Sequence, residues 1–230
     1  TIKASRKSMF NKEYLLCLGD GNLLKLLFEG MGRLIEEVKL CQCHCPKQFK
    51  KLSALLNGSK ISKLIVYSSD ITEVVASFIR EAVKAHKVDR VSLFHTKVSC
   101  ADPVNLLMEL SSYVHSLYLL QEYATGEVNS NRFFGLENAD WGRIIVEMFG
   151  RKLDKLRIYN RHNPYIDNRS ADVIREKIPR LGKKVWLSVS CDEYPIDLNY
   201  VLNEHSVKIG YDGHTPSVQI VHASREGESD

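Results

Sequence analysis

The sequence predicts an α/β solenoid, in which a curved parallel sheet has outer helices and about six to seven irregular repeats are stacked. Three observations lead to this prediction. A short apolar signature recurs at a nearly fixed spacing, helical periodicity returns between the copies, and polar side chains separate the apolar ones within each copy. The repeat also directs the functional prediction toward a binding surface and away from a catalytic pocket.

The apolar signature consists of three residues in the pattern apolar-x-x-apolar-x-apolar. Its five copies are Ile35-x-x-Val38-x-Leu40, Ile61-x-x-Leu64-x-Val66, Val88-x-x-Val91-x-Leu93, Val114-x-x-Leu117-x-Leu119 and Leu153-x-x-Leu156-x-Ile158. The first residues of successive copies are 26, 27, 26 and 39 positions apart. Such a period predicts a stack of similar supersecondary units, each of which buries its apolar face only against its neighbours.

Each copy has the alternation of a strand that is buried on one side. In the unit that begins at Ile61, Leu64 and Val66 point to one side, the small polar Ser69 follows, and Ile71 returns to the core. The pattern weakens toward both ends of the chain. There we expect a poorly formed strand near 15–18, a sixth strand at 182–187, a short seventh at 207–209 and, after the Asp212-Gly213 turn, a terminating strand over 217–221.

Segments with helical periodicity separate the strands. They cover 22–28, 46–56, 73–84, 103–110, 141–149 and 171–178. Residues that favour the N-cap position precede four of them, namely Thr72, Asp102, Asp140 and Ser170, and Pro103 takes a first helical position. Each unit therefore consists of strand, turn and helix.

A doubly wound α/β domain is the competing fold, because it also alternates strands and helices. Its strands are buried on both faces and are nearly continuous in apolar residues. Here lysine, arginine, aspartate and tyrosine lie between the apolar residues, so one face of the sheet meets solvent. This difference favours the solenoid.

The repeated units resemble the leucine-rich repeat consensus L-x-x-L-x-L-x-x-N/C-x-L. Cys43, Ser69 and Thr96 hold its special small position in the first three units, and the resemblance covers roughly residues 20–210. Full helices between the strands are similar to those of ribonuclease-inhibitor-like and F-box-associated members. The resemblance implies an intracellular protein-interaction module, and its F-box-associated and cullin-adaptor members point to a substrate receptor of a cullin-type ubiquitin ligase. In that class a separate N-terminal box recruits the ligase core; the chain begins at Thr1, so we expect an N-terminal domain to be missing.

The expected organisation has four parts. Residues 1–19 form an N-terminal segment or partial cap, 20–210 form the repeats, 211–224 form a C-terminal cap strand and 225–230 form a disordered tail. The fourth repeat is longer than its neighbours by about 13 residues, and the excess falls near 126–138 and contains Phe133 and Phe134. Such an insertion is a binding loop, or its two rings fold back over the strand edge or a helix.

Side chains between the buried strand positions would line the inner face of the curved sheet. One predicted row across the strands contains Lys39, Ile65, Ser92, Tyr118, Arg157 and Trp186, and the next contains Cys41, Tyr67, Phe94, Leu120, Tyr159 and Ser188. Aromatic residues with arginine are typical of interface hot spots. We therefore predict a partner-binding site made of Tyr67, Phe94, Tyr118, Leu120, Arg157, Tyr159 and Trp186, to which the insertion adds Phe133 and Phe134. The competing interpretation is that tyrosines on strands reflect β-propensity alone.

Composition limits the other classes of protein. The 230 residues have a formal net charge of +4, and the lysines and arginines are spread along the chain, which does not indicate a nucleic-acid partner. No apolar run approaches the roughly 18 residues of a membrane span. Three of the six cysteines lie within five residues, a poor spacing for disulfides, so we expect free thiols in a reducing cytoplasmic or nuclear compartment.

We expect no cofactor, no metal and no enzymatic activity. Cys41, Cys43 and Cys45 with His44 look like a zinc cluster. In the strand frame, however, Cys43 and Cys45 point to the core and Cys41 points the other way, so the ligands cannot converge. No nucleophile elbow, carboxylate pair or P-loop stands out. The main hypothesis is a non-catalytic protein-interaction module; the alternatives are a scaffold subunit of a stable intracellular complex and an α/β nucleotide-binding or enzymatic domain.

Overall fold

The fold is seen in a computed structural model of the chain. It describes residues 2–5, 13–16, 37–41, 56, 60–121, 132–134, 136–137, 139–160, 168–183, 185–190, 207–212 and 215–222. The expected helix over 22–28, most of the one over 46–56, and the tail over 225–230 lie outside these residues.

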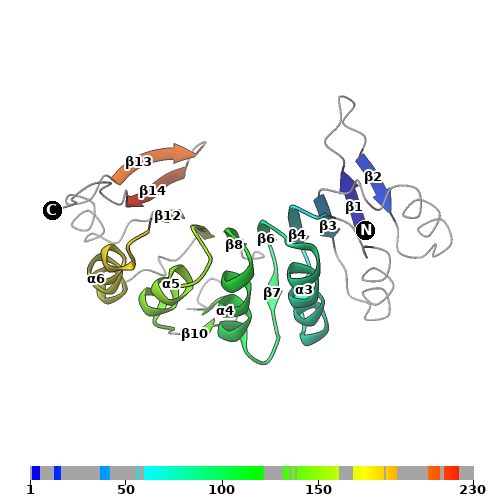
Figure 1. The fold of residues 1–230 in the computed structure, drawn as a ribbon, viewed down its shortest axis with the longest axis horizontal. Helices are drawn as coiled ribbons and strands as arrows, with labels where there is room; N and C mark the ends of the chain where they lie inside the picture. Colours follow the sequence, from blue (N-terminus) through cyan, green and yellow to red (C-terminus); the bar gives the residue numbers. More distant parts are fainter. Residues whose placement is uncertain are drawn as a thin grey trace.

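A ten-stranded sheet forms the centre of the fold (Figure 1). Its six middle strands are parallel and neighbour each other in the order of the chain: β3 Glu37–Cys41, β4 Lys63–Tyr67, β6 Arg90–Phe94, β8 Ser116–Gln121, β11 Lys155–Asn160 and β12 Val185–Ser190. This arrangement confirms the predicted α/β class with a mostly parallel sheet.

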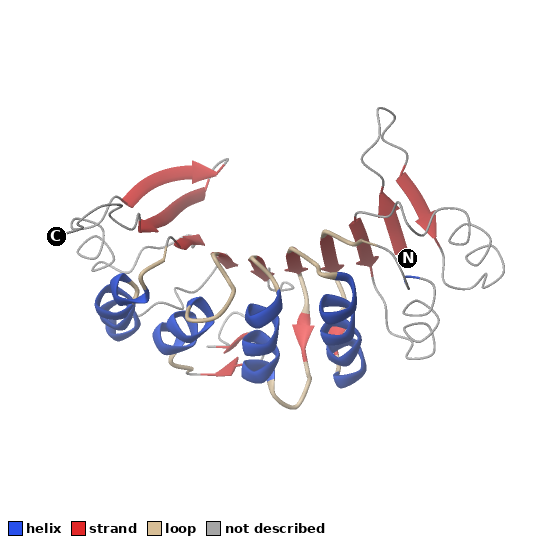
Figure 2. Cartoon of the chain, viewed as in Figure 1, coloured by secondary structure: helices blue, strands red, loops and turns tan. Residues whose placement is uncertain are grey.

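The described helices lie on one face of this sheet, which curves so that they occupy its convex side (Figure 2). They are α3 Glu73–His86, α4 Pro103–Tyr113, α5 Trp141–Phe149 and α6 Asn168–Lys177, followed by a 3-10 turn over Pro179–Leu181. A doubly wound sheet has helices on both faces and a reversal in strand order. Within the described elements the parallel strands have neither feature.

The predicted helix starts are correct for the two aspartates. Asp102 Oδ1 accepts a hydrogen bond from the Asn105 N–H at 2.9 Å, and Asp140 Oδ1 accepts one from the Arg143 N–H at 3.0 Å. Each bond satisfies a helix N–H that has no partner inside the helix. Thr72 does precede α3, but its side chain makes no capping hydrogen bond.

The fourth predicted start was wrong, because α6 begins at Asn168 and Ser170 lies inside it. Ser170 is only 3% exposed and faces Gly142 of α5. A Cβ atom at Gly142 would lie 2.5 Å from both the Cα and the carbonyl oxygen of Ser170. The two helix backbones therefore approach too closely for a larger residue, and serine serves here as a small packing residue.

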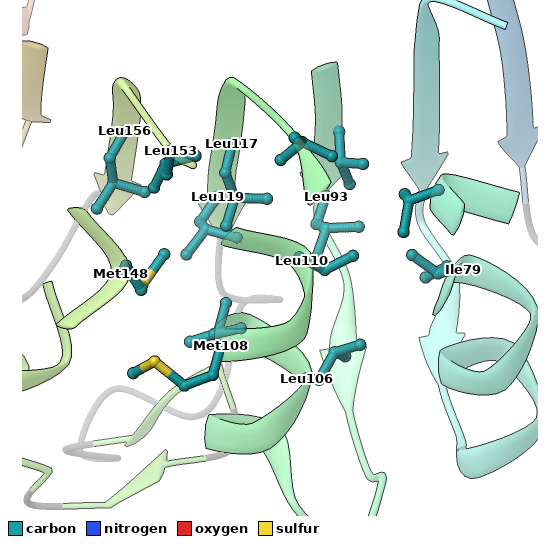
Figure 3. Packing of buried hydrophobic residues seen from close by; sticks show 14 of the residues in the cluster. Ile79, Leu93, Leu106, Met108, Leu110, Leu117, Leu119, Met148, Leu153 and Leu156 are labelled. Carbon is teal, nitrogen blue, oxygen red and sulfur yellow. The ribbon is translucent and has the colours of Figure 1, made fainter. Parts of the chain in front are cut away.

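The core lies between the sheet and the helices. All three signature positions in the units that begin at Ile61, Val88, Val114 and Leu153 are at most 1% exposed. Figure 3 shows how helix residues meet them, among them Leu110 beside Leu93 and Met148 near Leu156. Burial of an aliphatic side chain contributes about 1.5–3 kcal/mol, so the repeated signature accounts for the main stabilising contacts of the sheet.

The same backbone hydrogen bonds recur where the repeated strands begin. The Ser62 carbonyl accepts from two consecutive N–H groups of the next unit, and the carbonyls of Asp89 and His115 do the same. The donors lie 2.9–3.0 Å away and are Asp89 and Arg90, then His115 and Ser116, then Asp154 and Lys155. This repetition holds neighbouring units in one register.

The turns after β4 and β6 are also alike. Ser68 and His95 both have positive φ angles, 46° and 51°. Beyond them the special positions Ser69 and Thr96 are buried, and β5 Asp70–Ile71 pairs in parallel with β7 Lys97–Val98. The expected return of Ile71 to the core is confirmed, since its side chain is fully buried.

Both ends of the sheet are antiparallel. At the start, β1 Ile2–Ser5 lies between β3 and β2 Glu13–Leu16, so the strand expected near 15–18 does not extend the parallel set. At the other end, β14 Thr215–His222 lies between β12 and β13 Val207–Asp212. A strand does cover the expected 207–209, but it is not a seventh parallel strand, because β14 and not β13 pairs with β12.

The insertion contains a small hairpin of β9 Arg132–Phe133 and β10 Leu136–Glu137. Phe134 begins its turn with a φ of 53°, an unfavourable angle for a bulky residue. Its side chain is nonetheless 3% exposed and belongs to the hydrophobic core, with Leu136 packed beside that core. Burial of the ring offsets the backbone strain and fastens the insertion to the core.

Candidate partner-binding face

The side of the sheet opposite the helices is called the open face. It is formed by the strand residues that alternate with the buried signature positions. In the described part of the chain no helix packs on it (Figure 2). Its described side chains are Glu37, Lys39, Cys41, Lys63, Ile65, Tyr67, Arg90, Ser92, Phe94, Ser116, Tyr118, Leu120, Lys155, Arg157, Trp186 and Ser188.

Apart from the exposed Lys63, the large side chains on the open face are half-buried. Among the described residues the large hydrophobic side chains that are most exposed, Val74 at 42% and Tyr113 at 39%, are on helices instead. Ser92 is 2% exposed because it lies in register between Ile65 and Tyr118. The small Ser92 and Ser116 each lie between two larger neighbours, whereas Tyr67, Phe94 and Leu120 are three large side chains in adjacent register positions.

Three cations of the open face lie against aromatic rings. Lys39 Nζ is 4.8 Å from the ring centre of Tyr67, and Arg90 Cζ is 4.9 Å from that of Tyr118. Lys155 Nζ is 4.3 Å from the ring centre of Trp186. Each contact contributes about 0.5–1 kcal/mol at an exposed site, and each fixes a positive charge beside an apolar surface.

The register arranges the open face in rows across the strands. The first residues of the strands, Glu37, Lys63, Arg90, Ser116 and Lys155, lie in one row; its three basic members, Lys63, Arg90 and Lys155, are called the basic row. Tyr67, Phe94 and Leu120 lie in another row at the fifth residue; they are called the apolar row. Four residues of strand separate the two rows, a distance of about 13 Å.

Charge is distributed unequally between the two sides of the sheet. The described open face has five basic side chains and one acidic one, Glu37, which pairs with Lys63 at 3.4 Å. Helices α3 to α6 have six basic and six acidic side chains. The open face is therefore net positive, whereas the helical side is balanced.

The predicted site residues fall on three kinds of position. Tyr67, Phe94, Tyr118, Leu120 and Arg157 lie on the open face in the predicted rows. Tyr159 pairs through its backbone with Leu120, and its side chain, like that of Phe133, is outside the described residues. Phe134 is in the core, so it does not extend the open face.

Trp186 is on the open face, but its predicted row was wrong. It pairs with Lys155, while Ser188 takes the place opposite Arg157. The difference is a shift of two residues, which keeps every side chain on the same face. The shift places the tryptophan at the end of the basic row.

The sequence prediction placed Lys39 in a row of the sheet, but it left Lys39, Arg90 and Lys155 out of the binding site. A spacing could have identified two of them, because Tyr67 follows Lys39 by 28 residues and Tyr118 follows Arg90 by 28. Residues that pair across these two strand junctions are 26 positions apart in the sequence, and the next residue on the same face of a strand is two positions further on, which gives 28. The same diagonal contact therefore occurs at two strand junctions.

Two polar clusters lie elsewhere. His115 Nδ1 is 2.7 Å from Asp154 Oδ2 at the strand starts, with both side chains about half exposed. On the helices, Arg80 bridges Glu73 at 2.9 Å and Glu109 at 2.6 Å. The Arg80 guanidinium, which donates a hydrogen bond to Glu73, lowers the pKa of that carboxyl. The Arg80–Glu109 and His115–Asp154 pairs each join neighbouring units.

The described residues contain no group of three or more His, Cys, Asp or Glu side chains that could hold a metal ion. Cys43, His44 and Cys45 lie outside them, while the Cys41 side chain is half-buried. None of the described helices is both long enough and apolar enough to span a bilayer. No protein-family model, curated protein or solved structure matches the chain.

Proposed function

We propose that this chain is a leucine-rich-repeat-type solenoid that binds a protein partner on the open face of its sheet. The observation that carries the proposal is the apolar row, Tyr67, Phe94 and Leu120, which continues over three adjacent strands without a covering element in the described chain. Aromatic residues beside arginine are enriched at interface hot spots. The repeated turns and the chain-order sheet support the solenoid part of the proposal.

The half-buried state of these residues favours binding over a purely structural role. A ring held by its neighbours loses little rotamer freedom when a partner covers it, so less of the association energy is lost to ordering. β-Propensity explains an aromatic residue on a strand. It does not explain why five of the six charged side chains described on the open face are basic.

The test compares proteins captured from cell extract by the full-length protein and by matched variants. Tyr118→Ala together with Tyr159→Ala should remove the captured partner from a protein that remains folded. Loss of the Arg90 contact with Tyr118 accounts for about 0.5–1 kcal/mol, or about 1–4 °C of melting temperature. Tyr113→Ala is the control, because it deletes an exposed tyrosine that contacts Lys84 on the helical side. Unchanged capture by the double variant would contradict the proposal.

The same capture separates the two roles that a protein-binding solenoid could have. For the substrate-receptor role that the F-box-associated resemblance implies, we expect cullin-type ligase subunits among the proteins captured by full-length protein. A scaffold role predicts one stoichiometric partner that survives stringent washing without ligase subunits. In both cases the tyrosine variant should lose the protein that occupies the open face.

A further inference from the structure

We propose that the occupant of the open face is an acidic, amphipathic segment of a partner protein, which places carboxylates over the basic row and apolar side chains over the apolar row. The inference rests on the proposed function and specifies the chemistry of its partner. The first supporting observation is the charge of the two sides of the sheet. The described open face has five basic side chains and one acidic one, whereas the four helices have equal numbers of basic and acidic side chains.

Nearby carboxylates do not neutralise the basic row. Among the described residues, Arg90 and Lys155 form no ion pair with a carboxylate, and their charged groups lie over the rings of Tyr118 and Trp186. Lys63 does pair with Glu37, but its side chain is 46% exposed, and an ion pair in water is weak. Arg90 and Lys155 therefore remain available to a carboxylate ligand, and Lys63 can exchange its weak pair with Glu37 for such a ligand.

The distance between the rows limits the shape of the ligand. They are separated by about 13 Å along the strands, which is close to the roughly 10–12 Å diameter of an α-helix with its side chains. A helix lying across the strands would reach the basic row with one edge and the apolar row with the other. The residues on the edge of this partner helix that meets the basic row would be acidic. Those on the edge that meets the apolar row would be aliphatic or aromatic.

Nucleic acid fits the same face less well. Bases bind to exposed ring faces on a basic groove, but Lys39, Arg90 and Lys155 each lie over a ring that a base would use. Ile65 and Leu120 also interrupt the surface with aliphatic groups that have no stacking face. A protein segment can use these aliphatic positions, whereas a phosphate backbone cannot.

The experiment measures fluorescence anisotropy of labelled synthetic peptides with the full chain. One probe is an amphipathic helical peptide with glutamates along one edge and leucines along the other; its partner has glutamine at every glutamate position. We expect the glutamate peptide to bind about tenfold more tightly, and we expect the difference to shrink as salt screens the charges. An oligothymidylate strand serves as the nucleic-acid probe.

Two charge-reversed variants locate the effect. Lys63→Glu, Arg90→Glu and Lys155→Glu together should abolish the preference for glutamate, whereas Lys84→Glu, Arg143→Glu and Lys177→Glu on the helices change net charge equally and should retain it. If the first variant melts early, glutamine at the same three positions replaces it. Equal binding of the two peptides, absence of binding, a preference that survives reversal of the basic row, or tighter binding of oligothymidylate would each overturn the inference.

Failure of this inference can be told apart from failure of the proposed function. If the tyrosine variant loses its captured partner but reversal of the basic row does not, the open face binds protein and the acidic character is wrong. If neither variant loses the partner, both proposals are wrong.

Discussion

The contact between Gly142 and Ser170 gives a sharp test of how the helices pack. Gly142 is in the second position of α5, a helix with a buried face that includes Trp141, Ile145 and Phe149. In the Gly142→Ala variant, the added Cβ would lie 2.5 Å from Ser170 Cα and 2.5 Å from Ser170 O. Because both atoms belong to the backbone of α6, no side-chain rotation relieves the overlap.

Two opposing effects decide the magnitude. Alanine is the better helix former by about 1 kcal/mol, so helix propensity alone predicts stabilisation. Carbon atoms pack best at about 3.5–4.0 Å, so α6 would have to move away by about 1 Å, and overpacking of this kind costs about 1–3 kcal/mol. Because the clash involves two helix backbones, we expect the upper part of that range and a net loss of about 1–2 kcal/mol.

Thermal and urea unfolding, followed by circular dichroism, measure the difference. A chain of this size loses about 2–4 °C of melting temperature per kcal/mol, so Gly142→Ala should melt about 2–8 °C below the native protein. Glu147→Ala, on the exposed side of α5, introduces the same residue and should change stability by less than about 0.5 kcal/mol. Adding Ser170→Gly should not rescue the variant, since the contacts are with backbone atoms. A Gly142→Ala protein as stable as the native one would refute the close packing of α5 on α6.

Two further predictions concern the helix caps and a buried thiol. Asp102→Ala and Asp140→Ala should each lower the free energy of unfolding by about 1 kcal/mol in urea titration, because each leaves a helix N–H without its acceptor. The control is Asp172→Ala at an exposed helix position, which should cost less. Equal losses in the three variants would argue against capping. Burial raises the pKa of the Cys100 thiol, so peptide mapping should show slower alkylation by iodoacetamide at Cys100 than at the half-buried Cys41. Since the folded state holds the Cys100 proton more tightly, its contribution to stability should fall as pH rises above the ordinary thiol pKa, and this fall should be absent in Cys100→Ala.

Strand and helix positions could be predicted from sequence because several local signals agree at each of them. The helix expected over 141–149 is α5 without a change of bounds, since Asp140 supplies the cap and Gly150 follows the last turn. Ser170 shows where such signals fail. Serine suits an N-cap and also suits a crowded helix crossing, and only the position of Gly142 on the neighbouring helix distinguishes the two roles.

The ends of the sheet could not be predicted from the repeat alone. The sequence indicated the strands at 207–209 and 217–221 and the turn between them. Their order in the sheet depends on which strand of the hairpin meets β12, and β14 does so through Val185↔His222 and the following pairs. Both strands have alternating apolar residues, so their own pattern does not choose between them.

Energetics of the core determine which side chains the open face displays. If β11 slipped by one residue, Lys155 and Arg157 would enter the core and Leu156 and Ile158 would leave it, and burying two unpaired charges costs several kcal/mol each. A slip by two residues keeps every side chain on its own face, so the alternation does not oppose it. The sequence therefore predicts the face of Trp186 correctly but not its row. In the predicted register and in the observed one, the alternating residues Val185, Leu187 and Val189 remain on the same side of the sheet. The chemistry of the open face is thus fixed by burial of the signature residues, whereas the pairing of Lys155 with Trp186 depends on contacts between neighbouring strands, including the 4.3 Å cation–ring contact itself.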